Sequence, residues 1–178
     1  MKKKVLEQRK KLISILWFIV KFNLLAIPLY ILIYLNFSLP SVQIFLTNML
    51  TKTLQLMGYQ VSSEGFLLTL LSNNEIMRIE ISMDCTGWKS MYLLAALIFV
   101  TPSKLKKKTK FLVFSLVFLF FVNFIRILTT ILLSFRFGFQ YLDIIHTFLW
   151  REGLIFVVIA LWYLWLRRIN YNIRKMKI

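Results

Sequence analysis

The sequence predicts an all-α integral membrane protein with four transmembrane helices, an external amphipathic helix and a small external β-hairpin. Two observations indicate this class. Hydrophobic residues make up 59% of the 178 positions and the mean hydropathy is +0.72, which is too apolar for a water-soluble domain of this length. Lysine and arginine gather at the ends of long apolar runs, as they do beside membrane helices. We therefore expect residues 1–178 to form a single integral membrane domain.

The position of the positive charge predicts the orientation of the chain. The net charge is +16, and basic clusters precede the first apolar run, separate the later runs and follow the last one. Basic loops are retained in the cytosol, so both termini are predicted to be cytosolic, with anionic lipid as the electrostatic partner. No folded soluble surface carries these charges, which argues against nucleic acid. The single cysteine excludes an intrachain disulfide and a CxxC site, and we expect no cofactor and no metal.

The first third of the chain predicts one spanning helix and one helix on the outer membrane surface. The apolar run 12–37 has about 26 residues, more than the roughly 20 needed to cross, and no cleavage site follows it. The segment 42–57 has an apolar and a polar face at helical spacing, which is typical of an interfacial helix, and a fifth span there would bury Lys52. The apolar face has Val42, Phe45, Leu46, Met49, Leu50, Leu54 and Met57, and the polar face has Thr47, Asn48, Thr51, Lys52 and Gln55.

Residues 59–83 differ in character from the rest of the chain. The runs 66–71 and 76–82 flank the polar segment 72–75, which contains an Asn pair suited to a tight turn. The second run alternates apolar and polar side chains, as strands with one buried face do. This pattern predicts an external β-hairpin that leads the chain to Cys85.

The remaining sequence predicts three more spanning helices. They cover about 82–101, 111–135 and about 146–166, each close to the roughly 20 residues that a bilayer requires. The lysine-rich loop 102–110 is expected in the cytosol, and the short loop 136–143 is expected outside.

Residue counting places three chemically reactive side chains at a similar depth. At the rise of an α-helix, Cys85 lies about 5 Å inside the outer boundary and Arg126 about 22 Å from the cytosolic edge. His146, the one histidine of the sequence, falls at the outer boundary. A charge within a spanning helix costs at least about 2.5 kcal/mol to insert, which makes Arg126 a functional candidate. We therefore expect a thiol, a guanidinium and an imidazole near the outer face.

These three groups suit acyl transfer through a thioester. A thiol is a weak nucleophile until its proton is removed or its thiolate is stabilised, and histidine is the usual base. A fixed guanidinium can stabilise the oxyanion that develops during amide cleavage. We predict Cys85 as the nucleophile, His146 as general base and then acid, and Arg126 as the group that stabilises the thiolate or the oxyanion. Asn123 lies one helical turn before Arg126, where it can orient the guanidinium.

A structural interpretation of the same residues leads to a different class of protein. A lone cysteine in a membrane helix is usually a small apolar filler. Arg126 would then form a structural ion pair with Glu152, Asp84 or Glu80, in a non-catalytic scaffold or a small transporter. A further alternative is a plain intramembrane cysteine protease that releases its product to water.

The order of these motifs resembles the archaeosortase/exosortase family of integral membrane cysteine transpeptidases. The resemblance runs from about residue 79 to 166, although the chain is shorter than many members and has fewer N-terminal helices. It rests on Cys85-Thr86-Gly87 with Ser90 opening one helix, on Asn123-Phe124-Ile125-Arg126-Ile127 within the next, and on His146 beginning the last.

The resemblance implies an activity, a substrate and a set of site residues. The family is similar in activity to thiol proteases acting outside the membrane: it cleaves C-terminal sorting signals of exported proteins and transfers the product to a lipid anchor. Such a signal has a short motif, a transmembrane helix and a basic tail. The implied catalytic residues are Cys85, Arg126 and His146. The supporting positions that we add are Asn123, Asp84, Gly87, Ser90 and Glu152, of which Glu152 is not a family feature.

Overall fold

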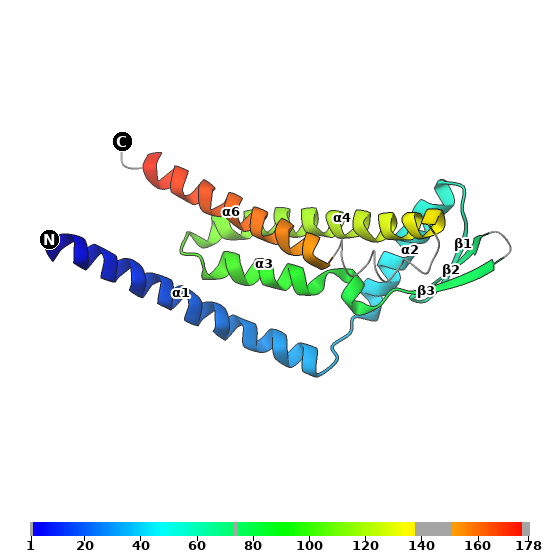
Figure 1. The fold of residues 1–178 in the computed structure, drawn as a ribbon, viewed down its shortest axis with the longest axis horizontal. Coiled ribbons are helices and arrows are strands. Elements are labelled where there is room, and N and C mark those ends of the chain that lie inside the picture. Colours follow the sequence, from blue (N-terminus) through cyan, green and yellow to red (C-terminus); the bar gives the residue numbers. More distant parts are fainter. Residues whose placement is uncertain (1, 73–74, 138–150, 176–178) are drawn as a thin grey trace.

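The computed structural model describes residues 2–72, 75–137 and 151–175, in which long helices run beside one another and a small sheet projects from one end (Figure 1). The helices are α1 (Lys2–Tyr34), α2 (Pro40–Leu56), α3 (Trp88–Val100), α4 (Leu105–Phe137) and α6 (Arg151–Lys175), with a 3-10 turn, η1 (Met83–Thr86). The strands are β1 (Gln60–Glu64), β2 (Leu67–Ser72) and β3 (Glu75–Glu80).

Helix α4 passes through two hydrophobic clusters and joins them. The first cluster packs α2 and the sheet against the second half of α4, where Phe124, Ile127 and Ile131 are buried. The second cluster packs α3 and α6 against the first half of α4, around Leu119. Cys85 packs against the first cluster, so the turn that carries it is held by α2, the sheet and the second half of α4.

Helix α1 contacts the protein along one line and leaves most of its apolar surface uncovered. The Tyr92 hydroxyl of α3 donates a 2.7 Å hydrogen bond to the Leu25 carbonyl, and Phe18 stacks on Trp162 of α6 with ring centroids 5.8 Å apart. None of the apolar window of α1 is buried inside the protein. Apolar surface of this extent is unfavourable in water, and a bilayer would cover it.

The prediction of four transmembrane helices is wrong. Over the described residues, two helices are long and apolar enough to cross a membrane, within Gln8–Tyr34 and Leu105–Ser134. The predicted second span is cut short because the chain turns at Gly87, after which α3 has only 13 residues. Such a helix is about 20 Å long, against about 30 Å for a bilayer core. The predicted fourth span begins at His146, which lies outside the described residues.

The prediction of an otherwise all-α protein with a two-stranded hairpin is also wrong. Strands β2 and β3 pair antiparallel as the pattern indicates, from Leu67 opposite Glu80 to Ser72 opposite Glu75. However, β1 pairs with the other edge of β2 to give a three-stranded sheet of order β1-β2-β3. Gly65, with φ +61°, lies in the tight turn between β1 and β2. Strand β1 is short and polar, so it carries little of the alternation that marks a strand.

Helix α2 forms close to the predicted residues, but it buries a different face. Gln43, Thr47 and Thr51, spaced four residues apart, are buried together with Leu46, Leu50 and Leu54. The predicted apolar residues Val42, Phe45 and Met57 are exposed instead. The hydroxyls of Thr47 and Thr51 donate to carbonyls one turn earlier, at 2.8 and 2.9 Å, so their burial leaves no donor unpaired.

Candidate active site

Cys85 lies in the η1 turn, between the sheet and α3. The Cys85 amide donates to the Ser82 carbonyl at 3.1 Å, which closes the turn after β3. Gly87 then takes a left-handed conformation with φ +74°, and α3 begins at the next residue. The sequence predicted a continuous helix here, but Cys85 precedes α3 instead of occupying its first turn.

Asn123 of α4 fixes the position of this turn. Its side-chain amide donates a 2.7 Å hydrogen bond to the Cys85 carbonyl, and the side chain is fully buried. Gly87 permits this approach, since a Cβ atom there would lie 3.0 Å from the Asn123 side-chain carbon Cγ. The amide N–H therefore binds the cysteine backbone, and no hydrogen bond joins the Asn123 oxygen to Arg126 among the described residues.

Two residues that the sequence did not single out complete the support of the cysteine. The Ser82 hydroxyl lies 3.4 Å from the Cys85 sulfur, and the buried Gln43 amide donates to the Ile81 carbonyl at 3.0 Å. Ser82 precedes the cysteine by three residues, the spacing of one 3-10 turn. Gln43 begins the polar stripe of α2. This stripe, which lies among leucines, is the sequence feature that could have pointed to Gln43.

Arg126 is buried near the thiol without an acidic partner among the described residues. Only 7% of its surface is exposed, its Nε has no hydrogen-bond partner there, and its helix packs on the η1 turn that carries Cys85. Asp84, one acid proposed to pair with it, instead forms an ion pair with Lys89 at 2.8 Å. Glu80 lies on an exposed strand position, and the side chain of Glu152 lies outside the described set.

Two of the three predicted catalytic residues lie on elements that pack against each other. The η1 turn that carries Cys85 packs on α4, the helix that carries Arg126. His146 lies outside the described residues, so its position relative to them stays a prediction. Ser90 is half-buried in α3, and no hydrogen bond joins its hydroxyl to the described residues.

A cavity of about 280 Å³ adjoins the cysteine turn on the side of α1. The last residues of α1 form one wall, and Ser82, Asp84 and Trp88 contribute to the other. The buried indole N–H of Trp88 finds no acceptor among the described residues. An indole N–H can only donate, so Trp88 keeps an unused donor beside this cavity.

Comparison with known families gives a match over most of the chain. A family model described as transmembrane exosortase (Exosortase_EpsH) matches residues 9–166. The match confirms the resemblance and extends it toward the N-terminus, through α1, α2 and the sheet. Neither the curated proteins nor the solved structures give a significant match.

Proposed function

The chain belongs to the transmembrane exosortase family, and on that premise we propose that it is a membrane-embedded cysteine transpeptidase with Cys85 as its nucleophile. Its substrates are exported proteins whose C-terminal sorting signal has a short motif, a transmembrane helix and a basic tail. The observation that carries the proposal is the anchoring of the cysteine turn by Asn123, on the helix that also bears the buried Arg126.

The reaction proceeds through a thioester. His146, acting as general base, takes the proton of the Cys85 thiol, and the thiolate attacks the carbonyl carbon of the scissile amide. The carbonyl electrons move to oxygen to give a tetrahedral oxyanion. Collapse of this oxyanion restores the carbonyl, breaks the C–N bond and releases the amine, which takes a proton from His146 acting as general acid. A nucleophile of the acceptor, such as a membrane lipid, then gives its proton to His146 and attacks the thioester carbonyl. The C–S bond breaks, the thiolate regains the proton, and the protein is left anchored.

Arg126 supplies the positive charge for this chemistry. A buried guanidinium in a site of low dielectric stabilises an anion much more strongly than it would in water. The cation has no acidic partner among the described residues, so its charge is available to the thiolate or to the oxyanion. Asn123 holds the Cys85 carbonyl and thereby sets the direction in which the thiol faces the substrate.

The site faces the outside of the cell in this proposal. The start of α1, the end of α6 and the α3–α4 connection lie toward one end of the molecule, and the sheet lies at the other (Figure 1). Lysine and arginine are concentrated at those three places in the sequence, which favours a cytosolic location for that end. An impermeant thiol reagent should fail to label a cysteine at position 107 from outside in a Cys85→Ser background. Labelling there would contradict the orientation.

Trapping of the acyl-enzyme tests the function directly. The enzyme is mixed with a sorting-signal substrate and analysed by intact mass spectrometry, with hydroxylamine added to release a thioester. We expect a hydroxylamine-sensitive adduct on the parent enzyme and none on Cys85→Ala. A protease that releases its product to water would form the adduct but no lipid-linked product. Processing that persists in Cys85→Ala, with no adduct on the parent, would remove the cysteine mechanism and favour a scaffold.

A further inference from the structure

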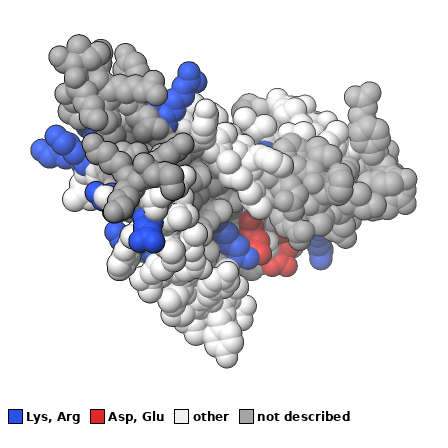
Figure 2. Space-filling view, turned by 60° about the vertical axis from the view of Figure 1, so that its left-hand side comes forward, with Lys and Arg blue, Asp and Glu red and all other residues white. Residues whose placement is uncertain are grey.

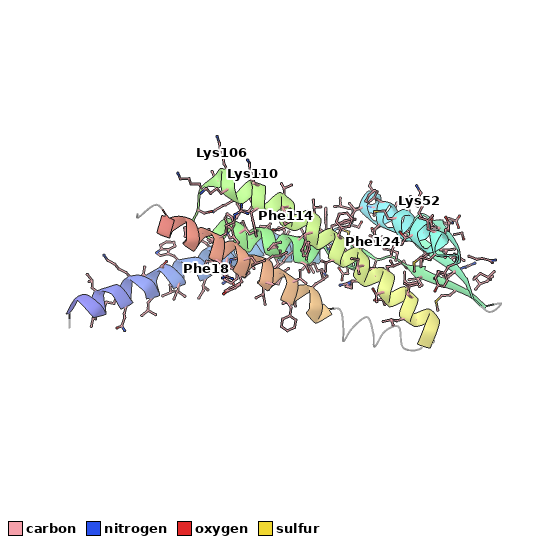
Figure 3. All side chains as sticks on the ribbon, turned by 90° about the horizontal axis from the view of Figure 1, so that it is seen from above. Phe18, Lys52, Lys106, Lys110, Phe114 and Phe124 are labelled. Carbon is pink, nitrogen blue, oxygen red and sulfur yellow. The ribbon has the colours of Figure 1, made fainter. Side chains whose placement is uncertain are left out.

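A second cavity, of about 460 Å³, lies at the opposite end of α3 from Cys85. It is formed by the α3–α4 connection, the start of α4 and the last turns of α6. Helix α3 has 13 residues, so roughly 20 Å separates this cavity from the cysteine turn. Figure 3 shows Lys110 and Phe114 near the start of α4, far from Phe124 and α2. The cavity is therefore distinct from the candidate active site.

The lining of this cavity carries positive charge and no acidic group. Lys104, Lys107, Lys110 and Arg168 all line it. In Figure 2 most of the lysine and arginine side chains in view lie toward the left, and the acidic residues lie near the centre with basic side chains beside them. The cavity also lies at the N-terminal end of α4, whose first turn holds no acid. Lysines at the positive end of a helix dipole repel it, and a bound anion would relieve that repulsion.

A neighbouring lysine, Lys108, differs from the lysines of the cavity because its ammonium group has a hydrogen-bond acceptor. Lys108 is buried and donates a 2.7 Å hydrogen bond to the Phe99 carbonyl in the last turn of α3. A cation is favourable at that position because the C-terminal end of a helix is negative. The lysines of the cavity have no such carbonyl or carboxylate within the described residues.

Two buried polar atoms in the cavity wall lack partners. Trp165 has 2% of its surface exposed, and its indole N–H finds no acceptor among the described residues. The Ser103 hydroxyl is likewise buried without a partner there. In contrast, the indole N–H of Trp162, one turn earlier in α6, donates to the Thr101 hydroxyl at 3.1 Å. An unpaired buried donor beside several cations indicates a ligand with acceptor oxygens.

The remaining wall of the cavity is apolar. Phe111 stacks on Trp165 with ring centroids 4.9 Å apart, and Phe114 and Ile169 extend the apolar surface. A free inorganic anion would bury none of this apolar surface favourably, whereas the acyl chain of a lipid would. We infer that this cavity binds the phosphate headgroup of an anionic membrane lipid, with the first part of the acyl chain against Phe111 and Phe114.

The test measures lipid binding to the purified full-length protein in neutral detergent. Native mass spectrometry and thermal unfolding are recorded with phosphatidylglycerol, with phosphatidylcholine and with inorganic phosphate. We expect the parent to retain and be stabilised by phosphatidylglycerol, and the Lys104→Gln/Lys107→Gln variant to bind it at least about tenfold more weakly. The matched control is Lys52→Gln/Lys106→Gln, which removes the same charge from exposed positions outside the cavity.

Each outcome bears on the inference. Equal weakening in the two double variants would reduce the effect to diffuse charge and overturn the site. Stabilisation by inorganic phosphate equal to that by phosphatidylglycerol, at equal concentration, would overturn the assignment to a lipid. Retention of phosphatidylcholine as strong as that of phosphatidylglycerol would overturn the role of the cations.

A second pair of variants separates binding from folding. Trp165→Phe removes an N–H that has no partner among the described residues, together with part of a buried ring system, so the lipid-free protein should lose packing but no hydrogen bond. Its affinity for phosphatidylglycerol should fall at least about threefold. Trp162→Phe loses the bond to Thr101, so it should lower the unfolding temperature while leaving the affinity unchanged. An unchanged affinity for phosphatidylglycerol in Trp165→Phe, or an equal loss of affinity in Trp162→Phe, would contradict the inference.

Discussion

The two ends of α4 use positive charge in different ways. Toward its C-terminal half, Arg126 is one buried cation near a thiol, and Asn123 is held by a 2.7 Å bond to the Cys85 carbonyl. At its N-terminal end, exposed lysines surround a partly apolar cavity. The proposed catalysis at the first region depends on the exact positions of a few atoms. The proposed lipid binding at the second depends on the number of positive charges around the cavity.

This difference follows from burial. A buried guanidinium cannot be replaced by a neighbouring cation, and its planar donors act in fixed directions. Exposed lysines are flexible, and each contributes a point charge that its neighbours partly duplicate. We therefore expect conservative substitutions to be damaging at the Cys85 end and tolerated at the lysine end.

The largest effect is expected for Arg126→Lys. The charge is kept, but lysine lacks the fork of donors, so processing of a sorting-signal substrate should slow about hundredfold, as on loss of an oxyanion donor. Processing rates are compared at equal amounts of folded protein in membranes. If the variant is well expressed and active, Arg126 serves the fold and the contrast between the two ends fails.

A smaller effect is expected for Gly87→Ala. A left-handed alanine costs roughly 1–2 kcal/mol, and its Cβ would press on the Asn123 side chain at 3.0 Å. We expect roughly tenfold slower processing, because a displaced Asn123 side chain would shift the Cys85 backbone that it holds, and small misplacements of a reacting group slow the chemical step. Gly65→Ala is the control, because Gly65 also has positive φ but no atom lies within 4 Å of its Cβ position. Equal loss of processing in both variants would show that the contact with Asn123 is unimportant.

The sequence predicted which groups meet more reliably than it predicted the backbone between them. Helical counting placed Cys85 and Arg126 at similar depth, and the η1 turn of Cys85 packs on the helix of Arg126. It missed the break at Gly87 because a single glycine is compatible with an apolar helix, and its positive φ is selected by Asn123, a residue distant in sequence. The role of His146 stays a prediction.

The buried face of α2 was missed for a related reason. Periodicity assigns threonine to the solvent, but Thr47 and Thr51 satisfy their hydroxyls within their own helix. Their burial therefore costs little, and the position of the sheet decides which face is covered. Strand β1 became a strand because β2 offered it an edge, which a local pattern cannot reveal.

A moderate effect is expected when a proline blocks the outer edge of the sheet. The Ile81 amide donates inward to the Phe66 carbonyl, so by alternation the Ile79 amide faces β2 and the Arg78 amide faces the open edge of β3. If the substrate pairs with that edge, Arg78→Pro should slow processing severalfold relative to Arg78→Ala without lowering the unfolding temperature. Ile79→Pro should destabilise the sheet itself. Processing by Arg78→Pro equal to that of Arg78→Ala would leave the sheet as a cover for the site.

The smallest effect is expected for Lys107→Arg, which exchanges the same two residue types as Arg126→Lys in the opposite direction. Lys107 is exposed and lines the cavity beside other cations, so exchanging one positive side chain for another keeps the charge around the cavity. We expect the free energy of unfolding to change by less than about 0.5 kcal/mol and phosphatidylglycerol binding to change by less than about twofold. Thermal unfolding and native mass spectrometry measure the two quantities on the same sample. A large loss here would mean that lysine geometry matters at this end too, and burial would no longer explain why Arg126 resists replacement.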